Sequence, residues 1–168
     1  MSKKKAMVKV PTYKTIKEIV VVGTEKGGDK KQFMFLDKNK KECIRSFNET
    51  WSEMSALGTC FNLRGLNGKK KIAIIGENCF EWMIAYYATL VGGNITVPMD
   101  CKLPAEDLAD QLIRCGCDAL VITSKFVGMA EEFKKNPDMP VKHYFCTDDF
   151  PTYLQKGYEI YDAGERGF

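Results

Sequence analysis

Few side chains of this sequence have the type and spacing of a catalytic or metal-binding site. His143 is the only histidine, so a histidine ligand cluster is excluded and any nucleophile–base pair would depend on it alone. It lies in the strand-like run VKHYFC, where a structural or surface role is the simpler interpretation. One residue separates Cys115 from Cys117, whereas redox and zinc motifs place two residues between their cysteines, and no second pair partners them. We therefore expect no metal site and no catalytic residue in this chain.

Two pairs of adjacent carboxylates are the remaining candidates for proton transfer. Glu131 precedes Glu132, and Asp148 precedes Asp149. Two carboxylates could share general acid–base work. Runs of acidic residues are more often solvated surface, and we interpret both pairs in that way.

Four polar residues follow two apolar runs that have the length of strands. Asp100 and Lys102 come after ITVPM, and Ser124 and Lys125 come after ALVIT. Ligands of parallel α/β sheets bind beyond the carboxyl ends of the strands, which makes these four residues the candidate binding residues. The alternative, that they only cap helices and solvate loops, stays open.

Strand-sized and helix-sized segments alternate between Lys71 and Thr123. The predicted strands are 71–75, 95–99 and 119–123, and the predicted helices are 79–91 and 104–115. This alternation predicts βαβ units, hence an α/β fold with a mainly parallel sheet and helices on both faces. Asn78 and Glu81 have the spacing of a capping box, which predicts the start of the first helix, and Gly116 ends the second.

The flanking segments predict further elements around this centre. They are a helix over 16–26, a hairpin of strands 32–36 and 42–46 at the sheet edge, helices over 46–64, 126–133 and 151–163, and a strand over 141–146. The run IVVV within the first helix also fits a strand. A phosphate-binding loop is excluded there, because Gly28 is followed by Asp29 rather than by Lys and Ser or Thr.

Size and charge define the class of protein. The chain has 168 residues, 45% of them apolar, and no apolar run long enough for a membrane span. Seven cysteines at irregular positions favour reduced thiols in the cytoplasm. Residues 1–45 carry thirteen basic and five acidic side chains, whereas the rest carry twelve and seventeen.

We expect two regions: a disordered basic arm over 1–12, and one domain over 13–168. A basic arm could attract nucleic acid or an anionic bilayer. No aromatic residues of an RNA-binding motif accompany it, so a solvated lysine-rich edge is the simpler interpretation and we expect no nucleic-acid partner.

The segment LVGGNITVPMD (90–100), with Ser46-Phe47-Asn48-Glu49 upstream, resembles the N-terminal part of the AMP-forming acyl-CoA synthetases. This adenylating superfamily includes luciferases and peptide-synthetase adenylation domains. The resemblance extends from about Tyr13 to about Gly164 and is closest to the long-chain fatty-acid branch. It implies that the chain is the first third of such an enzyme, without the phosphate loop and the small C-terminal domain.

The resemblance also implies a reaction and its ligands. ATP with Mg²⁺ would activate a carboxylic acid, expected to be a long-chain fatty acid, and coenzyme A would then displace AMP. Asp100, Lys102, Ser124 and Lys125 would lie near the coenzyme A nucleotide, and the chain alone would be inactive and hold no cofactor. Its partner would be the remainder of the same chain, and peripheral contact with a membrane stays open. Three alternatives also stay open: an adenylation domain for another acid or amino acid, a non-catalytic partner-binding module, and a lysine-armed nucleic-acid binder.

Overall fold

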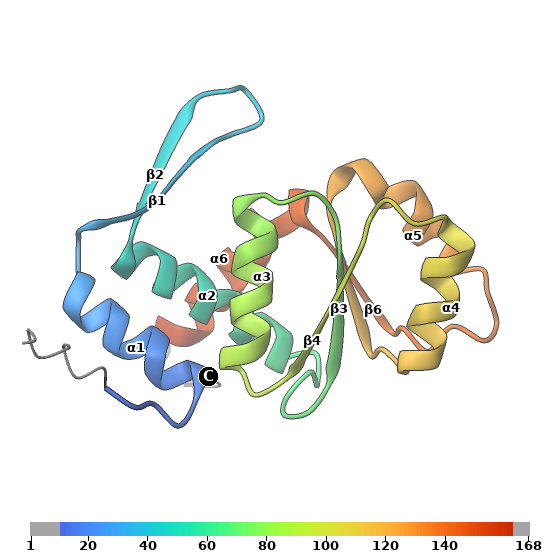
Figure 1. The fold of residues 1–168 in the computed structure, drawn as a ribbon, viewed down its shortest axis with the longest axis horizontal. Helices are drawn as coiled ribbons and strands as arrows, with labels where there is room; N and C mark the ends of the chain where they lie inside the picture. Colours follow the sequence, from blue (N-terminus) through green and yellow to red (C-terminus); the bar gives the residue numbers. More distant parts are fainter. Residues whose placement is uncertain (1–10, 163–168) are drawn as a thin grey trace, which may run out of the picture.

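A parallel sheet between two layers of helices forms the centre of the computed structural model, which describes residues 11–162 (Figure 1). The four strands lie in the order β4-β3-β5-β6. Their bounds are β3 Lys71–Ile75, β4 Ile95–Met99, β5 Ala119–Ile122 and β6 His143–Cys146. All three pairings are parallel, with Ile72 opposite Thr96 on one side and Ala119 on the other. The predicted α/β fold with a parallel sheet is thereby confirmed.

Alternating side chains of the central strands fill two separate cores. Ile72, Ile74 and Val121 pack on one face of the sheet against α2 (Phe47–Asn62) and α3 (Phe80–Val91). Ala73, Ile75 and their neighbours on β5 pack on the other face against α4 (Ala105–Cys115) and α5 (Val127–Phe133). A strand with both faces covered reads as a continuous apolar run, which is why KIAII and ALVI lack polar alternation.

The outer helices complete the α2–α3 side of the sheet. Helix α1 (Ile16–Gly27) begins at Thr15, whose side chain accepts a hydrogen bond from the Glu18 amide, so the segment is a helix and the strand alternative is wrong. Helix α6 (Phe150–Asp162) packs against α2. Figure 1 shows α1, α2, α3 and α6 on one side of the sheet and α4 and α5 on the other. None of the helices formed by residues 11–162 is long and apolar enough to cross a bilayer.

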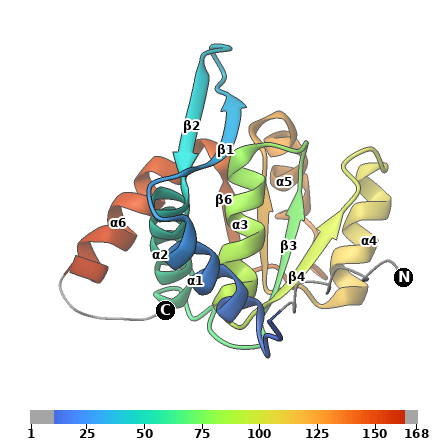
Figure 2. The same ribbon diagram turned by 60° about the vertical axis from the view of Figure 1, so that its left-hand side comes forward.

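The N-terminal hairpin forms a sheet of its own. Strands β1 (Lys31–Leu36) and β2 (Glu42–Ser46) pair antiparallel, and neither joins the parallel sheet at whose edge we expected the hairpin. Its aromatic side chains pack on α3 instead, and the ring of Phe35 stacks on that of Phe80 at 4.3 Å. The hairpin stands out from the helices, as both ribbon views show (Figures 1 and 2).

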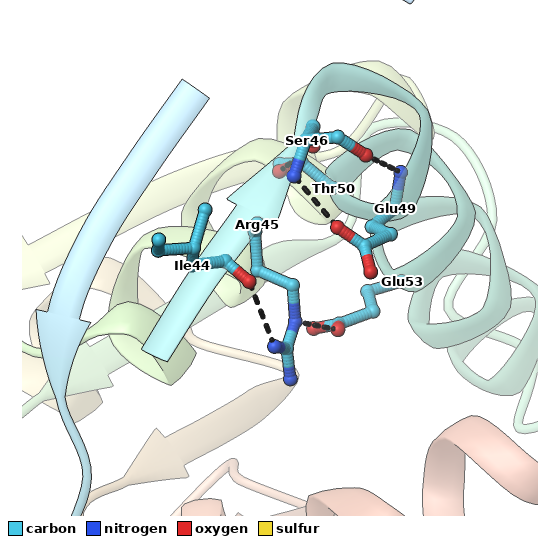
Figure 3. A network of polar contacts seen from close by, with 6 residues as sticks. All are labelled: Ile44, Arg45, Ser46, Glu49, Thr50 and Glu53. Carbon is cyan, nitrogen blue, oxygen red and sulfur yellow. Dashed lines mark hydrogen bonds and ion pairs between the residues drawn. The ribbon is translucent and has the colours of Figure 1, made fainter. Parts of the chain in front are cut away.

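The start of α2 is fixed by the residues that the sequence indicated. The Ser46 hydroxyl accepts from the Glu49 amide, and the Glu49 carboxylate accepts from the Ser46 amide, which completes a capping box (Figure 3). Thr50 donates its hydroxyl proton to the Ser46 carbonyl, and Arg45 donates to Glu53 at 2.6 Å. Burial raises the pKa of Glu53 in spite of this ion pair. The end of β2 and the start of α2 are thus held as one unit.

The cap of α3 differs from the prediction. The N-cap is Cys79 rather than Asn78, and its sulfur accepts a hydrogen bond from the Trp82 amide at 3.4 Å. The turn after β3 uses one residue more than expected, so the spacing of Asn78 and Glu81 does not become a capping box. A thiol is a weak acceptor, and this end of the helix is therefore less firmly capped than the start of α2.

Two short 3₁₀ turns precede the C-terminal helices and were not predicted. They are Ser124–Phe126 before α5 and Thr147–Asp149 before α6. The last predicted strand begins at His143 rather than at residue 141. The predicted arm over 1–12 and the last residue of the helix over 151–163 lie wholly or largely outside the described residues.

We predict that Asp118→Ala destabilises the chain by about 1–2 kcal/mol at pH 7, because its carboxylate accepts from the Lys71 amide at 2.9 Å and the Lys70 ammonium at 3.2 Å. Burial would raise the pKa of Asp118, but these hydrogen bonds outweigh burial and lower the pKa from the ordinary value of an aspartate. A lowered pKa contributes stability above the unfolded value that is lost as the pH falls. Urea unfolding should therefore show a difference from wild type that shrinks below about pH 4. Asp110→Ala, on the exposed face of α4, is the control and should change stability by less than about 0.5 kcal/mol.

Candidate functional site

The carboxyl edge of the parallel sheet carries all four candidate binding residues. Asp100 and Lys102 follow β4, at one end of the strand order, and Ser124 and Lys125 follow β5, two strands away. The loop after β3 lies between the two pairs and includes Glu77. The structure therefore places the predicted residues at one edge but divides them between two grooves.

The first groove holds Asp100 and Lys102. It has a volume of about 350 Å³ and is also lined by Glu77, Asn78 and Trp82. The Asp100 carboxylate accepts from the Lys102 amide at 3.0 Å, which fixes the turn after β4. The Lys102 side chain is exposed and has no ion-pair partner among the residues that the structure describes. Its ammonium group is thus available to a ligand at this edge.

The second groove holds Ser124 and Lys125. Its volume is about 450 Å³, and the tip of the hairpin and the turn after β6 close its far side. Lys125 donates to Glu77 at 2.5 Å, and this hydrogen bond raises the pKa of the lysine. Glu77 lines both grooves and is the residue that connects them. Its position two residues after a predicted strand could have identified it from the sequence.

An ion pair between Lys38 and Asp148 joins the hairpin to the second groove. The hydrogen bond between them raises the pKa of Lys38 and lowers that of Asp148. The residues are 110 positions apart, so no local pattern indicates the contact. Asp149 has a separate contact with the Tyr153 hydroxyl, so Asp148 and Asp149 do not act as a proton-sharing pair.

The other chemical candidates lie away from this edge. His143 begins β6 opposite Ala119, at the amino end of the sheet. Cys115 ends α4 and Cys117 lies between α4 and β5, also at the amino end of the sheet, and burial raises the pKa of the Cys117 thiol to about 11. A thiol with that pKa is protonated at neutral pH and is a poor nucleophile. The interpretation of these residues as structural stays a prediction.

The charges around the second groove are mixed. Its lining has four carboxylates (Asp37, Glu77, Glu81 and Asp148) and two lysines (Lys38 and Lys125), a formal charge of −2. A phosphate group would therefore need further cationic or backbone donors. Residues 11–162 hold no group of three His, Cys, Asp or Glu side chains placed to bind a metal ion.

Comparison with known proteins identifies the family. The model of the AMP-binding enzyme family matches residues 24–160, and no curated protein matches the sequence. The N-terminal domain of FACL13 from Mycobacterium tuberculosis superposes with a TM-score of 0.76 at 13% identity, over 85% of this chain and 36% of that chain. FadD1, a long-chain-fatty-acid-CoA ligase from Archaeoglobus fulgidus, gives 0.73 at 14% identity, over 91% and 33%.

A third similar structure is named for an acid other than a fatty acid. The O-succinylbenzoate coenzyme A synthetase MenE from Bacillus subtilis gives a TM-score of 0.67 at 16% identity, over 79% of this chain and 32% of that chain. At such identities the likeness shows the fold. The chain spans about a third of the length of these structures. Because the family model covers most of its sequence, the chain belongs to the AMP-binding enzyme family.

Proposed function

We propose that residues 13–168 form the N-terminal α/β scaffold of an ATP-dependent, AMP-forming ligase that joins a carboxylic acid to coenzyme A. The match of the AMP-binding family model to residues 24–160 carries this proposal. We further propose a long-chain fatty acid as the substrate, which the similarity to FadD1 supports. All seven cysteines are free thiols, which supports a cytoplasmic location.

The chemistry that we propose has two steps. The acid attacks the α-phosphate of ATP to give an acyl adenylate and pyrophosphate, and the thiol of coenzyme A then displaces AMP. Both steps develop negative charge on oxygen atoms, which backbone donors, a lysine and Mg²⁺ can stabilise. The described residues offer no such cluster, so we assign catalysis to the remainder of the enzyme and support of its ligands to this chain.

Because we assign catalysis to the remainder of the enzyme, we predict that the purified chain has no activity by itself. With ATP, Mg²⁺ and fatty acids of several lengths, ATP–pyrophosphate exchange should equal a buffer control. The reason is that the described residues offer no cluster of cationic groups, backbone donors and metal ligands around one site to stabilise the charge on the α-phosphate. Acid-dependent exchange above the control would contradict the proposal.

We propose that the carboxyl-edge residues Asp100, Lys102, Ser124 and Lys125 support the nucleotide of coenzyme A in the longer enzyme. Lys102 is the most direct test, because its ammonium group is exposed and unpaired within the described part of the chain. Lys102→Ala in the longer enzyme should raise the KM for coenzyme A about fivefold, the value of one partly exposed ion pair, and leave the KM for ATP unchanged. The control is Lys135→Ala, after α5, which should change neither constant. An unchanged KM for coenzyme A would refute this role.

Two other functions have specific support. A ligase for another acid is supported by MenE and by the anthranilate coenzyme A ligase AuaEII, which gives a TM-score of 0.73. A panel of fatty, aryl and amino acids offered to the longer enzyme separates these substrates. A non-catalytic, partner-binding role is supported by the lack of a catalytic cluster in residues 11–162, and would leave every acid of that panel without exchange.

A further inference from the structure

The β1–β2 hairpin has two faces with different surroundings. On the inner face Phe33 and Phe35 pack against the ring of Phe80 at 6.0 and 4.3 Å. On the outer face Met34 and Leu36 are 71% and 66% exposed. Phe33 and Phe35 alternate with these two residues along β1, so the inner face is anchored to the body of the protein and the outer face is not.

The outer face is continuous across both strands. Met34 is paired with Ile44 of β2 and Leu36 with Glu42, so the exposed carboxylate of Glu42 lies on the same face of the hairpin as the three apolar side chains. We call Met34, Leu36 and Ile44 the outer hairpin face. Met34 and Leu36 are the two most exposed large apolar side chains in the part of the chain that the structure describes. Apolar side chains exposed together on a projecting element mark a surface that binds something.

Basic residues surround this face. Residues 30–45 contain six basic and two acidic side chains, a formal charge of +4. Two of the six, Lys38 and Arg45, are engaged by Asp148 and Glu53. The others are exposed and have no ion-pair partner within residues 11–162; they are Lys30, Lys31, Lys40 and Lys41. The free charges thus lie at the base and at the tip of the hairpin, on either side of the apolar patch.

This combination favours a lipid surface over a second copy of the chain. Two copies meeting through this face would bring together two patches that each carry the same positive charge, which opposes association. An anionic bilayer offers the complementary chemistry, since headgroups attract the lysines and the interface accepts short apolar side chains. Both ribbon views show that the hairpin stands out from the helices, where it can approach a flat surface (Figures 1 and 2).

We propose that the outer hairpin face binds peripherally to membranes that contain anionic phospholipids. Apolar contact and charge act together, because neither two apolar side chains nor four lysines alone would hold the protein firmly. This inference does not depend on the proposed ligase function. If the chain does not bind membranes, the proposed ligase function is unaffected. If the chain does not belong to a ligase, the membrane proposal is likewise unaffected.

Co-sedimentation with vesicles tests the proposal. The chain should bind vesicles of phosphatidylcholine with about 30% phosphatidylserine, not vesicles of phosphatidylcholine alone, and should dissociate in about 1 M salt. Met34→Thr/Leu36→Thr, which preserves charge and strand propensity, should weaken binding about tenfold. Lys40→Gln/Lys41→Gln should weaken it about 25-fold, from roughly fivefold for each lysine near the surface. Circular dichroism and thermal unfolding check that each variant is folded.

Matched controls separate the outer hairpin face from general effects. Leu63→Thr removes another exposed apolar side chain, and Lys134→Gln/Lys135→Gln removes two lysines near the end of α5; each should change binding less than about twofold. The Met34→Thr/Leu36→Thr variant keeps every lysine of residues 1–10, so its loss of binding cannot be assigned to them.

Three results would overturn the proposal. The first is unchanged vesicle binding by the Met34→Thr/Leu36→Thr variant. The second is self-association of the chain that this variant abolishes, which would assign the face to a second copy. The third is a longer protein containing this chain that fails to bind the vesicles, which would assign the face to an internal contact.

Discussion

Replacing Gly157 with alanine should destabilise the protein by about 3 kcal/mol, although alanine is the better helix former by about 1 kcal/mol. Gly157 lies in α6 where that helix crosses α2, and a Cβ atom there would be 2.0 Å from the carbonyl oxygen of Ala56. The obstacle is backbone rather than a flexible side chain, so the two helices must move apart. Separating them would also loosen Phe150 and Tyr153, which pack at the end of the α2–α3 core.

The control is Gly23→Ala in α1. Nothing lies within 4 Å of a Cβ atom built there, and the substitution should stabilise by about 0.5–1 kcal/mol. In urea unfolding the two variants should shift the midpoint concentration in opposite directions, with the same dependence of the unfolding free energy on urea. The Tm of the Gly157→Ala variant should be about 6–12 °C below that of wild type. A Gly157→Ala variant as stable as wild type would mean that α2 and α6 are not in this close contact.

Asn94→Leu should lower the free energy of unfolding by about 3 kcal/mol, because it leaves two backbone groups without hydrogen-bond partners. Asn94 is 6% exposed and lies in the turn between α3 and β4. Its amide nitrogen donates to the Leu66 carbonyl at 3.0 Å, and its oxygen accepts from the Lys70 amide at 3.2 Å. One side chain thus ties the end of α2, the start of β3 and the start of β4 together at the amino end of the sheet.

Chemical unfolding measures this effect directly. Asn48→Leu is the matched control, because Asn48 is exposed on the first turn of α2, and its loss should stay within about 0.5 kcal/mol. Hydrogen exchange at the Lys70 amide should increase in the Asn94→Leu variant and not in the control. Equal stability of both variants would show that the Asn94 side chain does not hold these loops.

The central fold was predictable because its signals are local. Apolar runs such as KIAII and ALVI, separated by helix-length segments, leave few arrangements other than a parallel sheet covered on both faces. The sequence also predicts the hairpin, but it does not predict where the hairpin packs. Phe33 and Phe35 contact Phe80, so the hairpin packs on α3 and not at the edge of the sheet. Long-range packing of this kind leaves no periodic pattern in the sequence.

The errors at α3 and at the C-terminal helices have a similar origin. Asn78 is a better capping residue than Cys79, and local preference selected it. The length of the turn after β3 determines which residue becomes the N-cap of α3, and tertiary structure sets that length. The 3₁₀ turns before α5 and α6 likewise follow strand ends, where the chain must reverse within three residues.

The candidate site was predictable only in outline. The rule that ligands lie beyond strand ends identified Asp100, Lys102, Ser124 and Lys125, and the structure places all four at that edge. It could not show that the four residues fall into two grooves, or that Glu77 lines both. Nor could it show that Lys38 reaches Asp148 across 110 residues, since this pair depends on where the hairpin packs.

The most direct test of the scaffold role is ATP–pyrophosphate exchange by a chimera in which this chain replaces the corresponding segment of FadD1 from Archaeoglobus fulgidus. We predict acid-dependent exchange by the folded chimera and none by the chain alone, because we assign the catalytic groups to the remainder of the enzyme. A chimera that unfolds cooperatively but gives no exchange with any acid would contradict the account, as would exchange by the isolated chain.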